Sequence, residues 1–183
     1  MSWNLEKLQQ QYSRMQKMKY IFFWGHRAAK DGSISKSCFS QWWPCEFSDQ
    51  DHTYRNAEQY MMAEKARLFN DQEIRAKILQ NSEPGKIKAL GREIQHFQQE
   101  IWDQEKFNIV KRGNYLKFSQ NEDLKEFLLG TKERILVEAS PVDKIWGIGL
   151  AEDNPAVDNP FLWKGENLLG FALMEVREEL REV

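Results

Sequence analysis

One segment of the chain places a carboxylate and an amine where they could act together. Glu58 and Lys65 lie within NAEQYMMAEKA at 56–66, seven positions apart. Because seven residues make about two turns of an α-helix, both side chains would share one face, roughly 10 Å apart along the axis. Met61 and Met62 lie between them and would desolvate the lysine, which lowers its pKa and makes it an amine nucleophile. The simpler alternative is a solvated helix face whose lysine reaches to water.

A second group of polar and aromatic residues lies near position 140. The segment LVEASPVDKIWGIGL at 136–150 sets Asp143, Trp146 and Gly147 close together. A tryptophan ring can stack on a planar ligand, and glycine lets the backbone approach that ligand closely. Asp143 is also a residue type that caps turns. Further along, WKGENLLG at 163–170 places Asn167 as a helix N-cap whose amide could contact a ligand.

Helices must position most of these residues. The apolar residues Leu5, Leu8, Tyr12, Met15 and Met18 recur at helical spacing. The sequence predicts helices over 4–18, 56–69, 72–80, 84–94, 97–118, 122–130 and 168–181. The N-cap candidates are Asn56, Asp71, Ser82 and Asn121, and Asn56 forms a capping box with Gln59. Gly113 and Asn114 weaken the second half of the longest helix.

Strands are few and short in the predicted fold. Runs of aromatic and branched residues predict strands at 20–24 and 134–138, with short strands or turns around Pro44. Residues 26–37 and 139–167 read as loops, and a loop as long as the second is usually functional. No repeat or linker divides the chain. The sequence therefore predicts one α+β domain that is mainly helical and has a small sheet.

The composition excludes several classes of protein. The chain has 183 residues, 41% hydrophobic and 30% charged, with a net charge of −2, which indicates a soluble globular protein. Two cysteines and three scattered histidines match no zinc spacing, so we expect neither a metal nor another cofactor. No apolar run is long enough for a membrane span or a signal peptide, so we expect a cytoplasmic protein without a membrane partner. The balanced charge gives no general reason to bind duplex DNA. Aromatic residues make up 13% of the chain, and filling the core is the simplest role for them.

Six segments together resemble a known family. They are CFSQWWPCEF at 38–47, YRNAEQYMMAEKA at 54–66, LGRE at 90–93, KFSQN at 117–121, LVEASPVDKIWGIGL at 136–150 and WKGENLLGFALMEVR at 163–177. In this order they are similar to the NADAR, or YbiA-like, family. The resemblance implies a compact, mainly helical α+β domain over 20–183, preceded by an N-terminal helix extension over 1–19. It also implies N-glycosidase chemistry on phosphorylated ribosylamino-pyrimidine intermediates of riboflavin biosynthesis, or, as in some members, removal of ADP-ribose from guanine in DNA.

The resemblance also assigns residues. The family's glutamate and lysine fall on Glu58 and Lys65, and the tryptophan before its long helix falls on Trp102. Its Asp-x-x-Trp-Gly element falls on Asp143, Trp146 and Gly147, and the asparagine of its Trp-x-Gly-x-Asn element falls on Asn167. The chain departs from the family at Gln41, where many members have Asn, and in the longer loop at 26–37.

These assignments suggest how a ribosyl C–N bond would break. The transition state resembles an oxocarbenium ion, so it needs negative charge near C1′ and support for the departing base. We expect Glu58 and Asp143 to supply the carboxylates, with Glu58 as acid and base, and Trp102 and Trp146 to hold the base. Lys65 would attack C1′ to form a Schiff base, or would instead bind the substrate phosphate as a fixed charge.

Two other functions remain open. The same site could act on ADP-ribosylated nucleic acid through a single unpaired nucleotide, or the domain could bind a nucleotide or ADP-ribose without catalysis. The catalytic hypothesis makes a geometric prediction, because general core packing would scatter the carboxylates over the surface. Six residues should meet at one pocket: Glu58, Lys65, Trp102, Asp143, Trp146 and Asn167.

Overall fold

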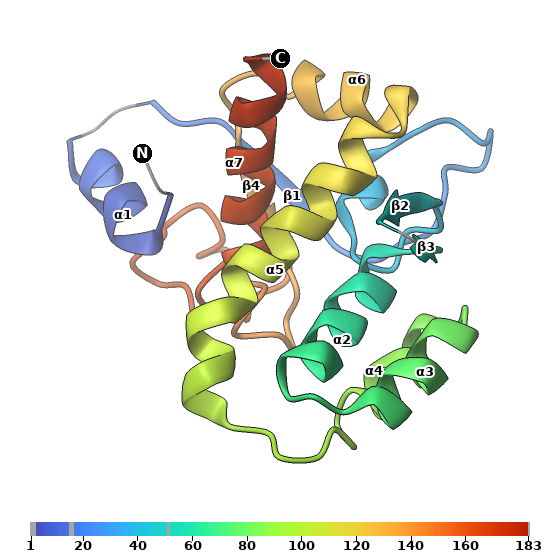
Figure 1. Cartoon of the computed structure of the whole chain (residues 1–183). Helices are drawn as coiled ribbons and strands as arrows, with labels where there is room; N and C mark the ends of the chain where they lie inside the picture. Colours follow the sequence, from blue (N-terminus) through green and yellow to red (C-terminus); the bar gives the residue numbers. More distant parts are fainter. Residues whose placement is uncertain (1–2, 15–16, 51, 183) are drawn as a thin grey trace. The chain divides into compact units, whose positions relative to one another are not determined.

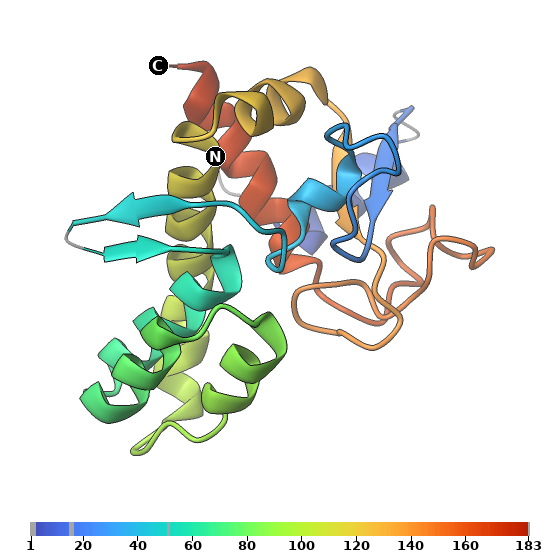
Figure 2. The same ribbon diagram turned by 90° about the vertical axis from the view of Figure 1, so that its right-hand side faces the viewer.

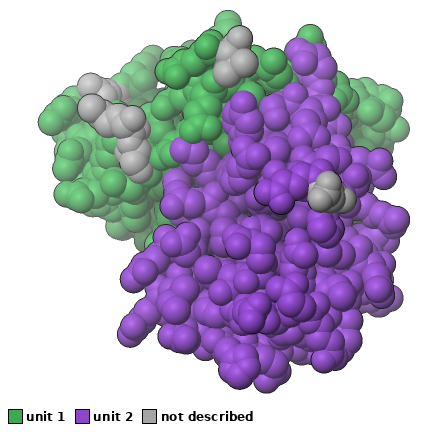
Figure 3. Space-filling model, in the orientation of Figure 1, with its two compact units in different colours: residues 1–40, 123–183 green, residues 41–122 purple. Residues whose placement is uncertain are grey.

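The two ends of the chain fold together, and the middle folds by itself. The computed structural model describes residues 3–14, 17–50 and 52–182. Residues 1–40 and 123–183 form the first compact unit, and residues 41–122 form the second (Figure 3). Because the chain leaves the first unit and later returns to it, no single linker separates the two, which explains why the composition shows none. The predicted boundary between 1–19 and 20–183 stays a prediction.

A pair of parallel strands is at the centre of the first unit. β1 (Tyr20–Phe23) pairs with β4 (Ile135–Glu138), and helix α7 (Leu168–Arg181) packs on β4 (Figure 1). The first three residues of β4 are buried, as expected for a parallel strand that is covered on both faces. α7 lies close to this strand because Gly170 has no side chain: a Cβ there would lie only 2.1 Å from the Leu136 carbonyl oxygen.

The remaining elements of the first unit are short, apart from one long loop. They are α1 (Leu5–Ser13), the 3-10 helix η1 (Lys36–Phe39) and α6 (Glu122–Gly130), whose first residue belongs to the second unit. Residues 139–167 contain neither helix nor strand, as predicted. Backbone hydrogen bonds nevertheless order this loop, among them Ile148 N to the Glu138 carbonyl at 3.0 Å and Lys164 N to the Ile148 carbonyl at 2.9 Å.

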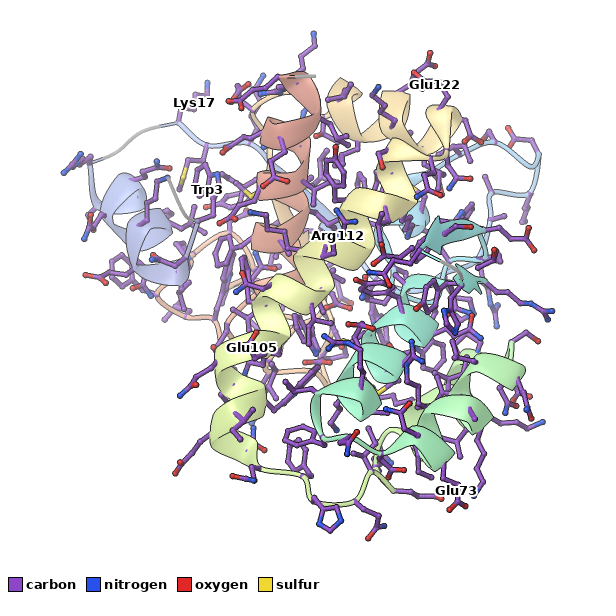
Figure 4. All side chains as sticks on the ribbon, viewed as in Figure 1. Trp3, Lys17, Glu73, Glu105, Arg112 and Glu122 are labelled. Atoms are coloured by element: carbon purple, nitrogen blue, oxygen red, sulfur yellow. The ribbon has the colours of Figure 1, made fainter. Side chains whose placement is uncertain are left out.

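Helix α2 (Ala57–Leu68) is the central element of the second unit. It packs against α3 (Gln72–Gln80), α4 (Pro84–Leu90) and α5 (Gln99–Ser119). A short antiparallel hairpin, β2 (Phe47–Asp49) and β3 (His52–Tyr54), precedes α2 (Figure 2). Arg112 of α5, labelled in Figure 4, donates a hydrogen bond to Asp49 Oδ1 at 3.2 Å and so ties the hairpin to this helix.

Side-chain caps set the starts of α2 and α3, as the sequence indicates. Asn56 Oδ1 accepts the Gln59 N–H at 2.9 Å, which confirms the N-cap of α2. Gln59 completes a variant of the capping box, because its Oε1 accepts the N–H of Arg55 at 2.8 Å rather than that of Asn56. Asp71 caps α3 through the Ile74 N–H at 3.0 Å, also as predicted.

Several predicted boundaries are wrong. α1 ends at Ser13 instead of continuing to residue 18, and Met15 lies outside the described residues. α4 ends at Leu90 instead of 94, and its N-cap is Glu83 rather than Ser82. The helix starts there because Pro84 takes the first helical position, where a missing N–H has no consequence. The β2–β3 hairpin was not predicted, because three residues per strand are too few to show an alternating pattern.

The fold class is as predicted. Over the described ranges the chain has seven α-helices and two sheets of two strands, so it is mainly helical α+β with little sheet. None of the helices in these ranges is both long and apolar enough to cross a membrane.

Candidate active site

Lys65 occupies a partly desolvated position in the last turn of α2. Its Nζ donates to the Gly91 carbonyl oxygen at 2.9 Å and lies 4.4 Å from the centre of the Phe97 ring and 5.5 Å from that of Trp102. Burial lowers the pKa of Lys65 below its ordinary value, and the negative charge of Glu58 acts in the opposite direction. The predicted lowering of this pKa is confirmed, although the aromatic neighbours come from outside α2.

The neighbouring carboxylate of Glu64 is engaged elsewhere. Glu64 Oε2 accepts a hydrogen bond from Arg67 Nε at 2.7 Å, one turn along the same helix. Glu64 is therefore bonded to Arg67, whereas Lys65 is bonded to the Gly91 carbonyl oxygen. The carboxylate that acts on the pKa of Lys65 is that of Glu58.

Glu58 is buried at the start of α2. Its side chain and backbone together are only 4% exposed, and its N–H donates to the Gln41 carbonyl oxygen at 2.9 Å. A carboxylate in the first turn is favoured by the positive end of the helix dipole. The sequence therefore places this acid in the first turn of the same helix that carries Lys65.

Gln41 and Asn114 form a buried amide pair beside the start of α2. Asn114 Nδ2 donates to Gln41 Oε1 at 2.8 Å and to the Val110 carbonyl oxygen at 2.9 Å. Gln41 is 8% exposed and Asn114 is fully buried. In the sequence, Gln41 was notable only as a departure from the family pattern, and Asn114 only as a residue that weakens a helix. The pairing fixes the segment whose carbonyl receives the Glu58 N–H.

The surroundings of Lys65 include residues that sequence reasoning missed. Trp102, predicted to bind the base, is 9% exposed and contacts the lysine from α5. Phe97 precedes the same helix, and Gly91 directly follows α4. A Cβ at Gly91 would lie 2.1 Å from the Met62 sulfur, so any other residue here would require the Met62 side chain to move. An aromatic residue before a helix and a glycine after one are weak signals by themselves, which is why neither was singled out.

In the first unit, Asp143 caps a turn. Its Oδ1 accepts the N–H groups of Ile145 at 2.9 Å and Trp146 at 2.8 Å, and its own N–H donates to Ser140 Oγ at 3.2 Å. The alternative role suggested by the sequence is therefore present. The carboxylate also fixes the backbone of the half-buried Trp146, while Oδ2 takes no part in the turn.

Gly147 packs against its own loop. A Cβ at this position would lie 2.9 Å from the Glu138 carbonyl oxygen and 3.1 Å from that of Asp143. We expected the glycine to admit a ligand to the backbone. The structure supplies a packing reason for this glycine, because the space beside it holds carbonyl groups of the loop itself, and the approach of a ligand stays a prediction.

Asn167 occupies the N-cap position of α7, but its side chain does not cap the helix. The residue is fully buried with a left-handed backbone, φ 56°. Its Oδ1 accepts the Glu138 N–H at 3.0 Å, and its Nδ2 donates to the Leu136 carbonyl oxygen at 3.0 Å. The predicted cap is therefore wrong in its bonding: the amide continues the hydrogen bonding of β4 and holds the end of the loop against that strand.

The structure thus groups the predicted residues within each unit. α2 and α5 bring Glu58, Lys65 and Trp102 together in the second unit. In the first unit, the turn at Asp143 holds Trp146, and the Asn167 N–H donates to the Gly147 carbonyl oxygen at 3.2 Å. The convergence of all six residues on one pocket stays a prediction. Within the described parts of the chain, no group of three or more His, Cys, Asp or Glu residues could hold a metal ion.

Comparisons with known proteins identify the family of the chain. The model of the NADAR domain matches residues 22–181. An N-glycosidase of Acanthamoeba polyphaga mimivirus is 47% identical over 170 residues, which cover 90% of this chain and 98% of the relative. An N-glycosidase of Nostoc punctiforme is 35% identical over 80% of this chain and 86% of its own length.

The same relationship appears in a solved structure. The NMR structure of Escherichia coli YbiA superimposes with a TM-score of 0.72 and 26% identity, over 91% of this chain and 88% of that one. In sequence, YbiA of strain K12 is named an N-glycosidase and is 30% identical over 75% of this chain and 76% of its own length. The chain therefore belongs to the NADAR family and is an enzyme of the N-glycosidase type.

Proposed function

We propose that the enzyme hydrolyses the ribosyl C–N bond of phosphorylated ribosylamino-pyrimidine intermediates of riboflavin biosynthesis, with Lys65 as covalent nucleophile. The environment of Lys65 is the observation that supports this proposal most. Its amine is bonded to one carbonyl oxygen, faces two aromatic rings and has a lowered pKa. A lysine in such a place is more readily deprotonated, and only the neutral amine can attack carbon.

The reaction proceeds through one covalent intermediate. The Lys65 amine attacks C1′ with its lone pair, the C1′–N bond breaks, and Glu58 donates a proton to the departing base. The sugar ring then opens: the attached nitrogen gives up one proton, its freed lone pair forms C1′=N, and the ring oxygen leaves with the electron pair of the C1′–O bond and takes that proton. Water adds to this Schiff base with Glu58 as base. Expulsion of the lysine then releases ribose phosphate and restores the amine.

The residues of the first unit have supporting roles in this proposal. Trp146, positioned by the turn at Asp143, offers a ring face to the planar base, as does Trp102 in the second unit. The Asp143 oxygen that is free of the turn supplies negative charge toward the oxocarbenium ion. Asn167 and Gly147 position the loop through the β4 backbone and through close packing.

Incubation with two substrates tests the proposed activity. The purified protein is incubated with ribosylaminouracil phosphate and, separately, with an oligonucleotide that carries ADP-ribosylated guanine. We expect the wild type to release free base and ribose phosphate from ribosylaminouracil phosphate. The Lys65→Met variant should release neither product from this substrate. Turnover of the oligonucleotide alone would replace the proposed substrate with ADP-ribosylated nucleic acid. Binding without turnover of either would reject the catalytic proposal in favour of a binding module.

A further inference from the structure

A carbonyl group from another segment supports the start of α2, at Glu58. The first N–H groups of a helix have no partner within the helix, so a cap, water or another segment must accept them. In α2 the Gln59 N–H is capped by Asn56, and the Glu58 N–H donates to the Gln41 carbonyl oxygen at 2.9 Å. The position of the Glu58 backbone therefore depends on where Gln41 is held.

Gln41 is held by Asn114 of α5. Asn114 Nδ2 donates to Gln41 Oε1 at 2.8 Å and to the Val110 carbonyl oxygen at 2.9 Å. The Val110 carbonyl accepts only a donor, so it fixes which end of the Asn114 amide faces Gln41. Within the ranges that the structure describes, Gln41 forms two hydrogen bonds, this amide contact and the carbonyl bond to Glu58. A chain of hydrogen bonds thus leads from the α5 backbone to the first turn of α2.

The stability of α5 does not account for an asparagine at position 114. The residue is fully buried in the interior of the helix, where asparagine is a poorer helix former than leucine. Its Oδ1 is buried without a hydrogen-bond partner among the described residues. An unpaired buried acceptor destabilises the folded protein, whereas an apolar side chain of similar shape has no such acceptor. The contact with Gln41 is what an apolar residue could not supply.

We propose that Asn114 is a positioning residue for proton transfer by Glu58, and that it acts through Gln41. The inference rests on the proposed function, in which Glu58 protonates the departing base and then activates water. Fixing Gln41 fixes the carbonyl group that holds the first turn of α2, and this turn carries the Glu58 carboxyl group. A displacement of about 1 Å in a catalytic group can lower a rate by roughly 10²-fold. Lys65, bonded to Gly91 at the other end of α2, does not depend on this chain.

A double variant removes both amides and keeps the approximate shapes of the side chains. Gln41→Met stays unbranched, and Asn114→Leu keeps its branch at Cγ. Because neither side chain loses a partner while keeping its own polar group, the urea midpoint of unfolding should equal or exceed that of the wild type. With ribosylaminouracil phosphate, kcat should fall at least about tenfold while KM changes less than about threefold. A purely structural role would instead lower the urea midpoint and leave kcat unchanged.

Hydrogen exchange of the Glu58 N–H, followed by NMR of the ¹⁵N-labelled protein, tests the same chain of bonds without substrate. The bond to Gln41 should protect this N–H in the wild type, and the double variant should exchange it at least about tenfold faster. The Ile74 N–H, capped by Asp71 at the start of α3, should exchange equally in both proteins. Asn108→Leu, the same substitution at an exposed position of α5, should change neither kcat nor this exchange.

Two results would overturn the proposal: unchanged exchange of the Glu58 N–H in the double variant, or faster exchange with the kcat of the wild type. If the double variant does not fold, Gln41→Met alone decides by the same measurements, because Asn114 then keeps its bond to Val110. Absence of turnover by the wild type would reject the proposed function instead. The exchange rates would still decide whether Asn114 holds the first turn of α2.

Discussion

Lys65 has contacts that a solvated surface lysine lacks. One backbone carbonyl accepts from its ammonium group, and two rings lie within 5.5 Å of the nitrogen. These groups stabilise the charged form of Lys65 less well than water does, because burial is the largest influence on the pKa of Lys65 and lowers it. The buried Glu58 opposes this effect from the other end of the same helix. Acid and amine are therefore coupled, and each can be tested by a variant that changes charge but not size.

Glu58→Gln should lower turnover by roughly 10² to 10⁴-fold, because it removes the group that transfers protons to and from the base. The amide has the same shape, so the free energy of unfolding should change far less than this loss would suggest. Steady-state kinetics and urea unfolding measure the two quantities. Glu64→Gln, on the same helix but paired with Arg67, is the matched control and should retain wild-type turnover.

Asp143→Asn should separate the two roles of this residue. The amide oxygen can still accept the N–H groups of Ile145 and Trp146, so the turn and the stability should persist, whereas Asp143→Ala should lose about 1 to 3 kcal/mol of unfolding free energy. If the carboxylate charge acts on the substrate, Asp143→Asn lowers kcat more than it raises KM. We expect this result from steady-state kinetics.

A double variant extends this experiment. Residues that act as one unit lose less activity together than the product of their single losses. The loss of kcat in the variant that combines Glu58→Gln with Asp143→Asn should therefore be smaller than the product of the two single losses. A loss of kcat in the double variant equal to the product of the two single losses would contradict a shared role in one reaction step. If Asp143→Asn has the kcat of the wild type, the role of Asp143 is to cap the turn and not to act on the substrate.

At the scale of elements, the contact between α2 and α5 depends on a glycine. A Cβ at Gly113 would lie 2.6 Å from the Tyr60 ring, so Gly113→Ala should destabilise the protein by about 1 to 3 kcal/mol through overpacking. Propensity alone predicts the opposite, since alanine is the better helix former by about 1 kcal/mol. Gly130→Ala is the control: nothing lies within 4 Å of its Cβ position, so it should not destabilise. Equilibrium unfolding in urea gives both values.

Local signals predicted the elements better than the contacts between them. The caps at Asn56 and Asp71 and the bounds of α3, α7 and the long loop follow from side-chain chemistry within a few residues. Gly113 and Asn114 appeared as weak helix positions because their roles depend on partners distant in sequence. The amide of Asn114 binds Gln41, 73 positions away. The same reason hid Gly91 and Phe97, whose link to Lys65 exists only after α4 and α5 pack on α2.

The candidate site shows the same limit. The shared helix of Glu58 and Lys65 was readable from spacing, and so was the turn-capping chemistry of Asp143. The bonding of Asn167 to β4 was not, because its partners lie 29 and 31 positions away. An asparagine before a helix is read as a cap, and its left-handed backbone turns the amide toward the strand instead.

At the scale of the molecule, stability should fall at alkaline pH through Tyr20. Its pKa is raised from 10.0 to about 12 in the folded protein, so the native state holds a proton that the unfolded chain has lost. This contribution is complete below pH 10 and disappears as the pH rises through about 12, at a rate of at most about 1.4 kcal/mol per pH unit.

Urea unfolding at pH 8, 10, 11 and 12 measures this dependence. Tyr20→Phe should have a smaller loss of stability between pH 10 and 12 than the wild type, and no stability loss at pH 8, because the hydroxyl has no partner there. Buried Tyr54 and Tyr60, whose pKa values are also raised, should keep part of the slope in the variant. Identical slopes in both proteins would show that Tyr20 does not contribute.

Trapping with borohydride tests the central claim, that Lys65 forms a covalent bond to the sugar. The protein is incubated with ribosylaminouracil phosphate, reduced with sodium borohydride, digested and analysed by mass spectrometry. We predict a reduced ribose phosphate adduct on Lys65 that requires substrate and is absent from Lys65→Arg, which keeps the charge but not the nucleophile. Continued turnover with no adduct on Lys65, or substantial activity of Lys65→Arg, would contradict the covalent mechanism and leave the lysine as a fixed charge for the substrate phosphate.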